Sequence, residues 1–193
     1  ELPTPHEPAP RLGSAIGSNA LSIKREDLSG LGLGGNKPRQ IEAIFAAAEA
    51  AGCNAVVTTA GAQSNFCRAT AAAAARLGWR CVLLLRGSDD TAAQGNLLLD
   101  RVFGAEVHWI DVSDPYSDEI QHRLDALVAD VAADGDRPYL IRLPGVTGPL
   151  AAAAAVSLAD ELLDQWARPA NYVVVAAGSG LTAAGLVAGF ARA

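Results

Sequence analysis

Short apolar runs alternate with longer amphipathic stretches along most of the chain. The apolar runs show little polar alternation, which is typical of strands covered by helices on both faces. These runs predict strands at residues 55–59, 80–85, 106–112, 139–143 and 172–177. Helices are expected at residues 41–51, 64–77, 96–103, 115–133, 150–166 and 181–192. The alternation predicts an α/β fold in which parallel sheets carry helices on both faces.

The N-terminal segment, an internal turn and the C-terminal end of the chain differ from this regular part. Residues 1–20 are rich in Pro, Gly and Ser and are expected to be extended, and residues 21–24 are expected to form a short strand. Residues 145–148 interrupt the alternation and suggest a return from a small lobe to a larger one. Because no further strand follows the helix at 181–192, the sequence looks like part of a larger fold.

Composition excludes several classes of function. The formal net charge is −6 and no basic stripe is present, so we expect no nucleic-acid partner. The three cysteines have neither CxxC nor zinc-site spacing, so we expect no metal site and buried thiols in a reducing, cytoplasmic compartment. The uncharged stretch 172–191 has the length of a membrane span, but a β-branched run, a glycine turn and a helix explain it better.

The glycine-rich segment 30–39 holds the first candidate residue, Lys37. Pro38 suits the first turn of the helix that follows, and the glycines allow the backbone to approach a ligand closely. The segment is not a phosphate-binding Walker loop, because Asn36 and Pro38 stand where that motif needs Gly and Ser or Thr. A loop with one solvated lysine is the alternative interpretation.

Two further loops lie where predicted strands end and helices begin, the usual ligand position in parallel sheets. Gln63, Ser64 and Asn65 precede one helix, where they either bind a ligand or, in the alternative, cap the helix. The second loop is suited to bind a phosphate through backbone N–H groups, unless it is simply a tight turn. Its residues are Gly178, Ser179, Gly180, Leu181 and Thr182.

Together the three loops favour one cofactor. A lysine that can form an imine, a phosphate cradle and polar groups for a ring are what pyridoxal 5'-phosphate needs. A dinucleotide would use the 178–182 turn but has no use for Lys37. A nucleotide-binding α/β module nevertheless remains an alternative.

In the order and spacing of its motifs, the chain resembles the D-cysteine desulfhydrase and 1-aminocyclopropane-1-carboxylate (ACC) deaminase family. These are pyridoxal-phosphate enzymes with the tryptophan synthase β fold, known as fold type II. The resemblance covers essentially the whole chain. Its motifs are Pro3-Thr-Pro5, Ile23-Lys-Arg-Glu-Asp27, Gly34-Gly-Asn-Lys37, Gln63-Ser-Asn65 and Gly178-Ser-Gly-Leu-Thr182.

The resemblance implies a role for each loop. Lys37 would bond to the cofactor as an imine and move protons at the substrate carbon. Asn65 would contact the cofactor ring oxygen, Ser64 would contact or act on the substrate, and Gln63 would help to bind it. The 178–182 turn would hold the phosphate. Residues 1–52 and 143–193 would form the large cofactor domain, incomplete here, and residues 53–142 the small inserted domain.

The implied activity is a β-elimination from a small amino acid such as D-cysteine, giving a 2-oxo acid and ammonia. ACC ring opening and a truncated, non-catalytic remnant that binds the cofactor or a partner are the alternatives. The family's usual state is a homodimer, and a second polypeptide completing the fold is also considered. The chain departs from the family at two places. Arg39-Gln40 stands where the family commonly has an Arg-Lys pair, which predicts the loss of a phosphate contact. Phe66 stands where the family often has His or another polar residue.

Overall fold

The computed structural model describes residues 2–142 and 147–193. The chain divides into two compact units, one formed by Glu1–Gln40 with Pro149–Ala193 and the other by Ile41–Gly148. The sequence places the corresponding boundaries at 52/53 and 142/143, and the assignment of these parts to the family's domains stays a prediction. The last residue of the strand expected at 139–143, and residues 145 and 146 of the expected return segment, lie outside the described residues.

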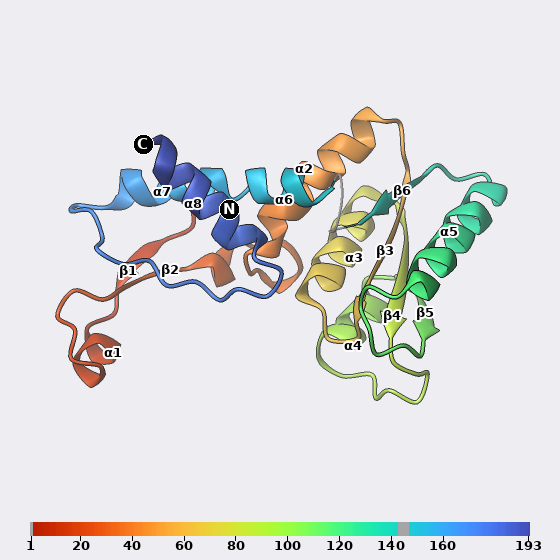
Figure 1. The fold of residues 1–193 in the computed structure, drawn as a ribbon, viewed down its shortest axis with the longest axis horizontal. Helices are drawn as coiled ribbons and strands as arrows, with labels where there is room; N and C mark the ends of the chain where they lie inside the picture. The colour runs from red at the N-terminus through yellow and green to blue at the C-terminus, as the bar shows by residue number, and fades with distance from the viewer. Residues whose placement is uncertain (1, 143–146) are drawn as a thin grey trace. The chain divides into compact units, whose positions relative to one another are not determined.

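A four-stranded parallel sheet forms the centre of the second unit (Figure 1), with strand order β5-β4-β3-β6. Three helices, α3, α4 and α5, accompany the sheet. The strands are β3 (Ala55–Gly61), β4 (Arg80–Arg86), β5 (Glu106–Ile110) and β6 (Pro138–Ile141). The helices are α3 (Asn65–Leu77), α4 (Gly95–Val102) and α5 (Asp118–Ala133).

Helices cover both faces of this sheet. Alternate strand residues, such as Val57 and Leu84, pack against the apolar side of α5, which includes Leu124 and Leu127. The alanine-rich helix α3 packs on β3 and β4 from the other side (Figure 1). The parallel sheet with helices on both faces is therefore confirmed, and it explains why the strands are apolar along their whole length.

The first unit combines a small β-ribbon with helices. Strand β1 (His6–Pro8) pairs antiparallel with β2 (Ser22–Lys24), so the expected extended segment contains a strand and a short helix, α1 (Pro10–Ala15). Pro10 begins α1, a position at which proline is favoured because its missing N–H would be unpaired anyway. The remaining elements are η1 (Glu26–Leu28), η2 (Leu31–Leu33), the first residues of α2 (Lys37–Ala50), α6 (Thr147–Ala153), α7 (Val156–Gln165) and α8 (Leu181–Arg192).

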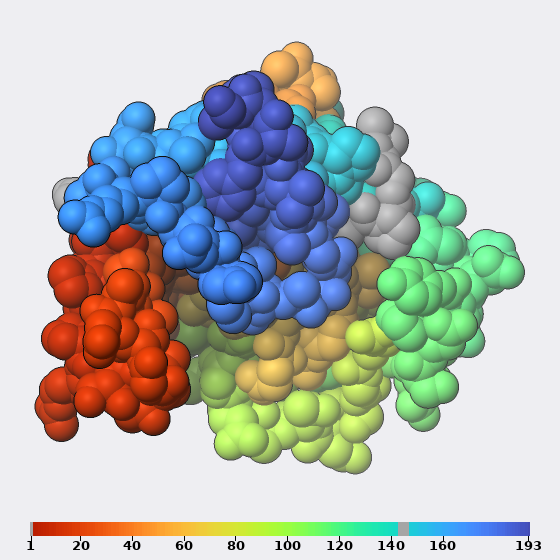
Figure 2. All heavy atoms as spheres, turned by 60° about the vertical axis from the view of Figure 1, so that its left-hand side comes forward, coloured from red at the N-terminus to blue at the C-terminus, as the bar shows by residue number. Residues whose placement is uncertain are grey.

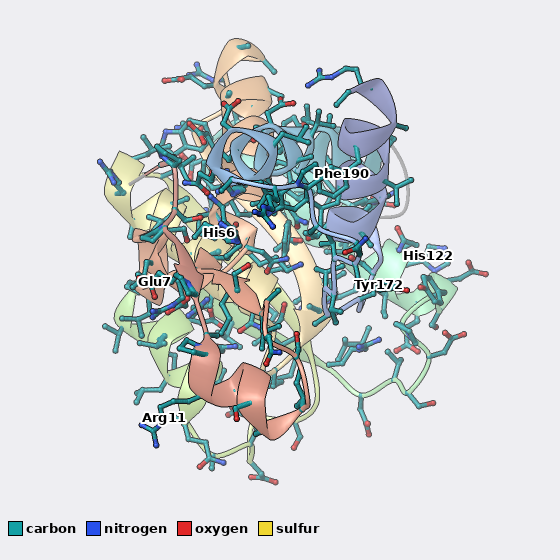
Figure 3. All side chains as sticks on the ribbon, turned by 90° about the vertical axis from the view of Figure 1, so that its left-hand side faces the viewer. His6, Glu7, Arg11, His122, Tyr172 and Phe190 are labelled. Carbon is teal, nitrogen blue, oxygen red and sulfur yellow. The ribbon has the colours of Figure 1, made fainter. Side chains whose placement is uncertain are left out.

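Close packing of α8 on its neighbours forms the core of this unit. Leu158 and Leu162 of α7 pack against Leu186 of α8, and the Trp166 and Phe190 rings stack with centroids 5.5 Å apart. Figure 3 labels Phe190 on α8. A Cβ atom at Gly185 would lie 2.2 Å from the Ala152 carbonyl oxygen, and one at Gly189 would lie 2.4 Å from Ala159 Cβ. The glycine pair therefore lets two helices approach closely within one unit. No helix in the described part of the chain has the length and apolarity needed to cross a bilayer.

Two expectations for this unit are wrong. The helix expected at 150–166 is divided into α6 and α7 by a turn at residues 154–155, beside the position where Gly185 approaches. The strand expected at 172–177 is not formed, because no described strand lies beside it to accept its backbone hydrogen bonds. Tyr172 is 88% exposed and Val174 is 95% exposed, and Figure 2 shows the blue spheres of the chain between α7 and α8 at the surface.

Replacing Gly185 with alanine tests the packing of α8. Alanine usually stabilises a helix interior by about 1 kcal/mol relative to glycine. Here the added methyl group would meet the Ala152 carbonyl oxygen and Ala155 Cβ, which lies at 2.5 Å. We expect overpacking to dominate and Gly185→Ala to lower the free energy of unfolding by about 1–3 kcal/mol. Val187→Ala on the exposed side of α8 is the matched control and should change it by less than about 0.5 kcal/mol. A Gly185→Ala protein as stable as the wild type in urea unfolding would contradict this packing.

Candidate functional site

The glycine-rich segment before α2 turns sharply onto the η1 segment. Gly30, Gly32, Gly34 and Gly35 all have positive φ angles. A Cβ atom at Gly34 would lie 1.9 Å from the Asp27 carbonyl oxygen, so no other residue fits there. This turn places Lys37 half-buried as the first residue of α2.

Two residues that flank Lys37 bind the same hydroxyl group. Asn36 Nδ2 donates to Thr182 Oγ1 at 2.7 Å, and Gln40 Nε2 donates to it at 3.1 Å. Thr182 is the second residue of α8, whose N-cap Gly180 has a φ of 79°. The lysine loop and the 178–182 turn, although about 140 positions apart in the sequence, are therefore joined within one unit.

The beginning of α8 is open to a ligand. The first N–H groups of a helix have no partner within the helix and carry a partial positive charge. Gly178 and Ser179 are exposed and Gly180 is half-buried, and Cβ atoms built at the two glycines would meet nothing within 4 Å. The turn therefore has room for an anion against its backbone, and the phosphate contact expected from the sequence stays a prediction.

The sequence contains two lysines, and the structure distinguishes them clearly. Lys24 Nζ donates to the Thr4 carbonyl oxygen at 2.7 Å, to Glu161 Oε2 at 2.7 Å and to Gln165 Oε1 at 2.8 Å. An ammonium group has three N–H donors, so these bonds occupy Lys24 completely.

Lys37 is the available amine of the two. Among the described residues none accepts a hydrogen bond from Lys37 Nζ. Burial lowers the pKa of Lys37, because the ammonium form loses hydration. A larger fraction of this lysine is therefore a neutral amine, the form that attacks an aldehyde to give an imine.

Arg39 lies two positions after Lys37 and is the centre of a buried ion cluster. Its guanidinium donates to Glu26 Oε2 at 2.7 Å and Oε1 at 2.8 Å, and to Glu161 Oε1 at 2.7 Å and Oε2 at 2.9 Å. Thr4 Oγ1 in turn donates to Glu26 Oε1 at 2.6 Å. With Lys24, the cluster contains two cations and two carboxylates, and the Arg39 side chain is only 3% exposed.

Residues of the sequence motifs that carry the family resemblance have a structural role in this cluster. Thr4, Lys24 and Glu26 come from two motifs that are separate in the sequence, and Arg39 follows a third, Gly34-Gly-Asn-Lys37. Their side chains bind one another and Glu161 of α7, and thereby fix the first turn of α2. Arg39 has both carboxylates as partners, so it is committed to the protein interior rather than to an external anion.

The Gln63-Ser64-Asn65 loop belongs to the other unit and lies at the beginning of α3. Ser64 Oγ accepts from Phe66 N at 3.1 Å and from Cys67 N at 3.2 Å, so Ser64 is the helix N-cap. The capping interpretation of the loop thus applies to Ser64. Its proposed action on a substrate stays a prediction.

The beginning of α4 binds the other two residues of this loop. Gln63 Oε1 accepts from Asn96 N at 2.9 Å, and Gln63 Nε2 donates to the Gln94 carbonyl oxygen at 3.0 Å, so both ends of this amide are occupied. Asn65 Oδ1 accepts from Asn96 Nδ2 at 2.9 Å, which leaves the Asn65 amide N–H groups for another partner. The proposed ligand contacts of Gln63 and Asn65 stay predictions, and sequence reasoning missed Asn96.

A mainly apolar cavity of about 350 Å³ lies in the first unit, and Lys24 and Glu26 of the ion cluster are among its lining residues. Its lining includes Leu158, Leu162, Trp166 and residues 172–175, but neither Lys37 nor any residue of the 178–182 turn. It is the space beside the unpaired 172–175 segment, and it takes no part in the candidate site.

The profile of the protein family described as "Pyridoxal-phosphate dependent enzyme" matches residues 1–193. The chain is 40% identical over 195 residues to a D-cysteine desulfhydrase of Klebsiella pneumoniae, covering 97% of this chain and 57% of that protein. The crystal structure of an ACC deaminase homologue superposes with a TM-score of 0.86 at 36% identity, covering 97% of this chain and 56% of that one. A pyridoxal 5'-phosphate-dependent aspartate racemase has a TM-score of 0.71 at 22% identity and shows likeness of fold alone. The chain spans about half the length of these proteins.

Acid should weaken the ion cluster through Glu161. Burial alone raises the pKa of Glu161, but hydrogen bonds from Arg39 and Lys24 outweigh it and lower the pKa from 4.5 to about 2. A carboxylate with a lowered pKa stabilises the fold fully above its unfolded pKa and loses this contribution as the pH falls toward the folded value.

We therefore expect Glu161→Gln to lower the free energy of unfolding at neutral pH by about 1.5–3 kcal/mol. The difference from wild type should narrow as the pH falls from about 4.5 toward 2. Urea unfolding across this range is the measurement, and Glu49→Gln, on an exposed side of α2, is the matched control. A difference that is independent of pH would show that the charge of Glu161 does not stabilise the cluster.

Proposed function

Because the chain belongs to the family of pyridoxal-phosphate-dependent enzymes, we propose that it binds pyridoxal 5'-phosphate through Lys37 and the 178–182 turn. The single observation that carries this proposal is the pair of hydrogen bonds from Asn36 and Gln40 to Thr182, which joins the two loops. The residues present fit the cofactor. Lys37 offers an amine without a described partner, and the beginning of α8 offers free N–H groups for a phosphate.

The proposed reaction is a β-elimination from a small amino acid that carries a thiol or chloride, as in a D-cysteine desulfhydrase. When bound, the cofactor supplies an electron sink for the negative charge that forms at the α-carbon. For cysteine, the Cα–H and Cβ–S bonds break, hydrogen sulfide leaves, and water then releases pyruvate and ammonia.

Lys37 is the proposed acid and base of this reaction. Its pKa is lowered by burial, so at neutral pH a larger fraction of Lys37 than of an exposed lysine is the free amine that can accept a proton from the α-carbon. The buried cluster around Arg39 keeps the first turn of α2 in place while Lys37 exchanges its proton. For the other unit we propose that Asn65 donates to the cofactor ring oxygen and that Ser64 and Gln63 contact the substrate.

Two alternatives use the same lysine. Ring opening of ACC is supported by the likeness to an ACC deaminase homologue. A cofactor-binding chain that needs a further polypeptide for catalysis is supported by the match to only about half of the relatives' length. We propose a cytoplasmic location from the cysteine usage. We propose a homodimer because that is the usual state of the family.

Product analysis with the purified chain tests the function. With pyridoxal 5'-phosphate present, we expect pyruvate and ammonia from D-cysteine, in equal amounts, and at least about a hundredfold less from Lys37→Ala, since general acid–base catalysis contributes about that much. Lys37→Ala must retain the circular dichroism spectrum of the wild type.

Three outcomes separate the alternatives. 2-Oxobutanoate from ACC, with no pyruvate from D-cysteine, would favour ring opening. A lysine-dependent absorbance band at about 410–420 nm without any product would favour the non-catalytic alternative. Absence of both the band and the products would contradict the proposed function.

A further inference from the structure

The hydroxyl of Thr182 has its acceptor capacity filled. A threonine hydroxyl offers two lone pairs and one hydrogen. Asn36 Nδ2 and Gln40 Nε2 donate to the two lone pairs at 2.7 Å and 3.1 Å. What remains is the O–H hydrogen, and no group in the described parts of the chain accepts it. Thr182 is 6% exposed, so solvent does not readily supply that acceptor.

A second buried group at this place also lacks a partner. Gln40 is 1% exposed, and its Oε1 atom has no hydrogen-bond partner within residues 2–142 and 147–193. A buried amide oxygen without a partner costs free energy, so an apolar side chain would be the better choice if only packing mattered. The amide therefore has a use beyond packing, and its N–H contact with Thr182 indicates what that use is.

In the described structure no cationic side chain donates a hydrogen bond to the Thr182 hydroxyl. Arg39, the neighbour of Gln40, donates to Glu26 and Glu161, and no lysine or arginine donates to Thr182. The groups that donate to Thr182 are thus the neutral amides of Asn36 and Gln40. The Thr182 hydroxyl and the first helix N–H groups are neutral donors as well.

We infer that Asn36 and Gln40 are positioning residues that make the Thr182 hydroxyl a hydrogen-bond donor to a phosphate oxygen. By filling both lone pairs they leave Thr182 able only to donate, which suits an anion and disfavours any ligand group that needs an acceptor. In the family a lysine commonly follows the arginine at this place, and its positive charge is absent here. The neutral hydrogen bonds from Asn36 and Gln40 to Thr182 would take its place. This inference rests on the proposed function, because it takes the phosphate to be that of the bound cofactor.

Reversing the polarity of residue 40 tests the inference. Glutamate has nearly the same shape as glutamine, but its carboxylate only accepts, so in Gln40→Glu it would draw the Thr182 hydrogen toward itself and away from the phosphate. Dissociation constants would be measured for pyridoxal 5'-phosphate and for pyridoxal, from the Lys37-dependent imine absorbance, with inorganic phosphate as a competitor.

We expect Gln40→Glu to weaken pyridoxal 5'-phosphate binding at least about tenfold and pyridoxal binding less than about twofold, since charge-assisted hydrogen bonds to phosphate are strong ones. Inorganic phosphate should compete less well with the variant. Gln121→Glu on α5 carries the same change of charge in the other unit and should bind both compounds like the wild type. Thermal unfolding checks that each variant is folded.

A double-mutant cycle separates positioning from a general structural role. In a Thr182→Val background the hydroxyl is absent, so Gln40→Glu should weaken pyridoxal 5'-phosphate binding less than in the wild type. Equal weakening of both compounds, or the full effect of Gln40→Glu in the Thr182→Val background, would overturn the inference while leaving the proposed function intact. A wild-type chain that forms no imine at Lys37 would instead contradict the proposed function.

Discussion

The buried guanidinium of Arg39, held by two carboxylates, is the interaction on which the candidate site depends. Glu26 and Glu161 come from different parts of the first unit, and Arg39 belongs to the first turn of α2. Removing one partner would leave an uncompensated buried charge, which is costly. The cluster therefore fixes the helix turn that carries Lys37, and Lys24 completes its charge balance.

The same helix turn determines what meets the 178–182 turn. Asn36 and Gln40 lie on either side of Lys37 in the sequence, and both reach Thr182 at the beginning of α8. Close packing of α8 on the end of α6 and on α7, permitted by Gly185 and Gly189, holds the other side of this contact. The turn that carries Lys37 and the beginning of α8 are thus joined within one unit, which is the arrangement that the proposed binding of a phosphorylated aldehyde requires.

Much of this arrangement could be predicted from the sequence, because local pattern determines it. The parallel sheet follows from apolar runs that alternate with helices, and the family resemblance of the five motifs is confirmed by the match over residues 1–193. The strand at 172–177 was wrongly predicted, because a β-branched run forms a strand only where another strand offers hydrogen bonds.

The partners within the site could not be predicted. Nothing local distinguishes Lys24, which is fully bound, from Lys37, which has no described partner, since the difference comes from Glu161 and Gln165 more than 130 positions away. The roles of Gln40 and Asn96 likewise depend on contacts between distant segments. Ser64 illustrates the opposite case, because its capping role is local and was among the expected interpretations.

Chemical trapping of the imine tests the central claim most directly. The chain is mixed with pyridoxal 5'-phosphate, reduced with borohydride and digested, and the modified amine is located by mass spectrometry. The account predicts a phosphopyridoxyl group on Lys37, little on Lys24, and lower occupancy of Lys37 when pyridoxal replaces the phosphorylated compound. Modification of Lys24 to the same extent, or equal labelling of Lys37 by both compounds, would contradict the claim that this lysine and the 178–182 turn bind one cofactor together.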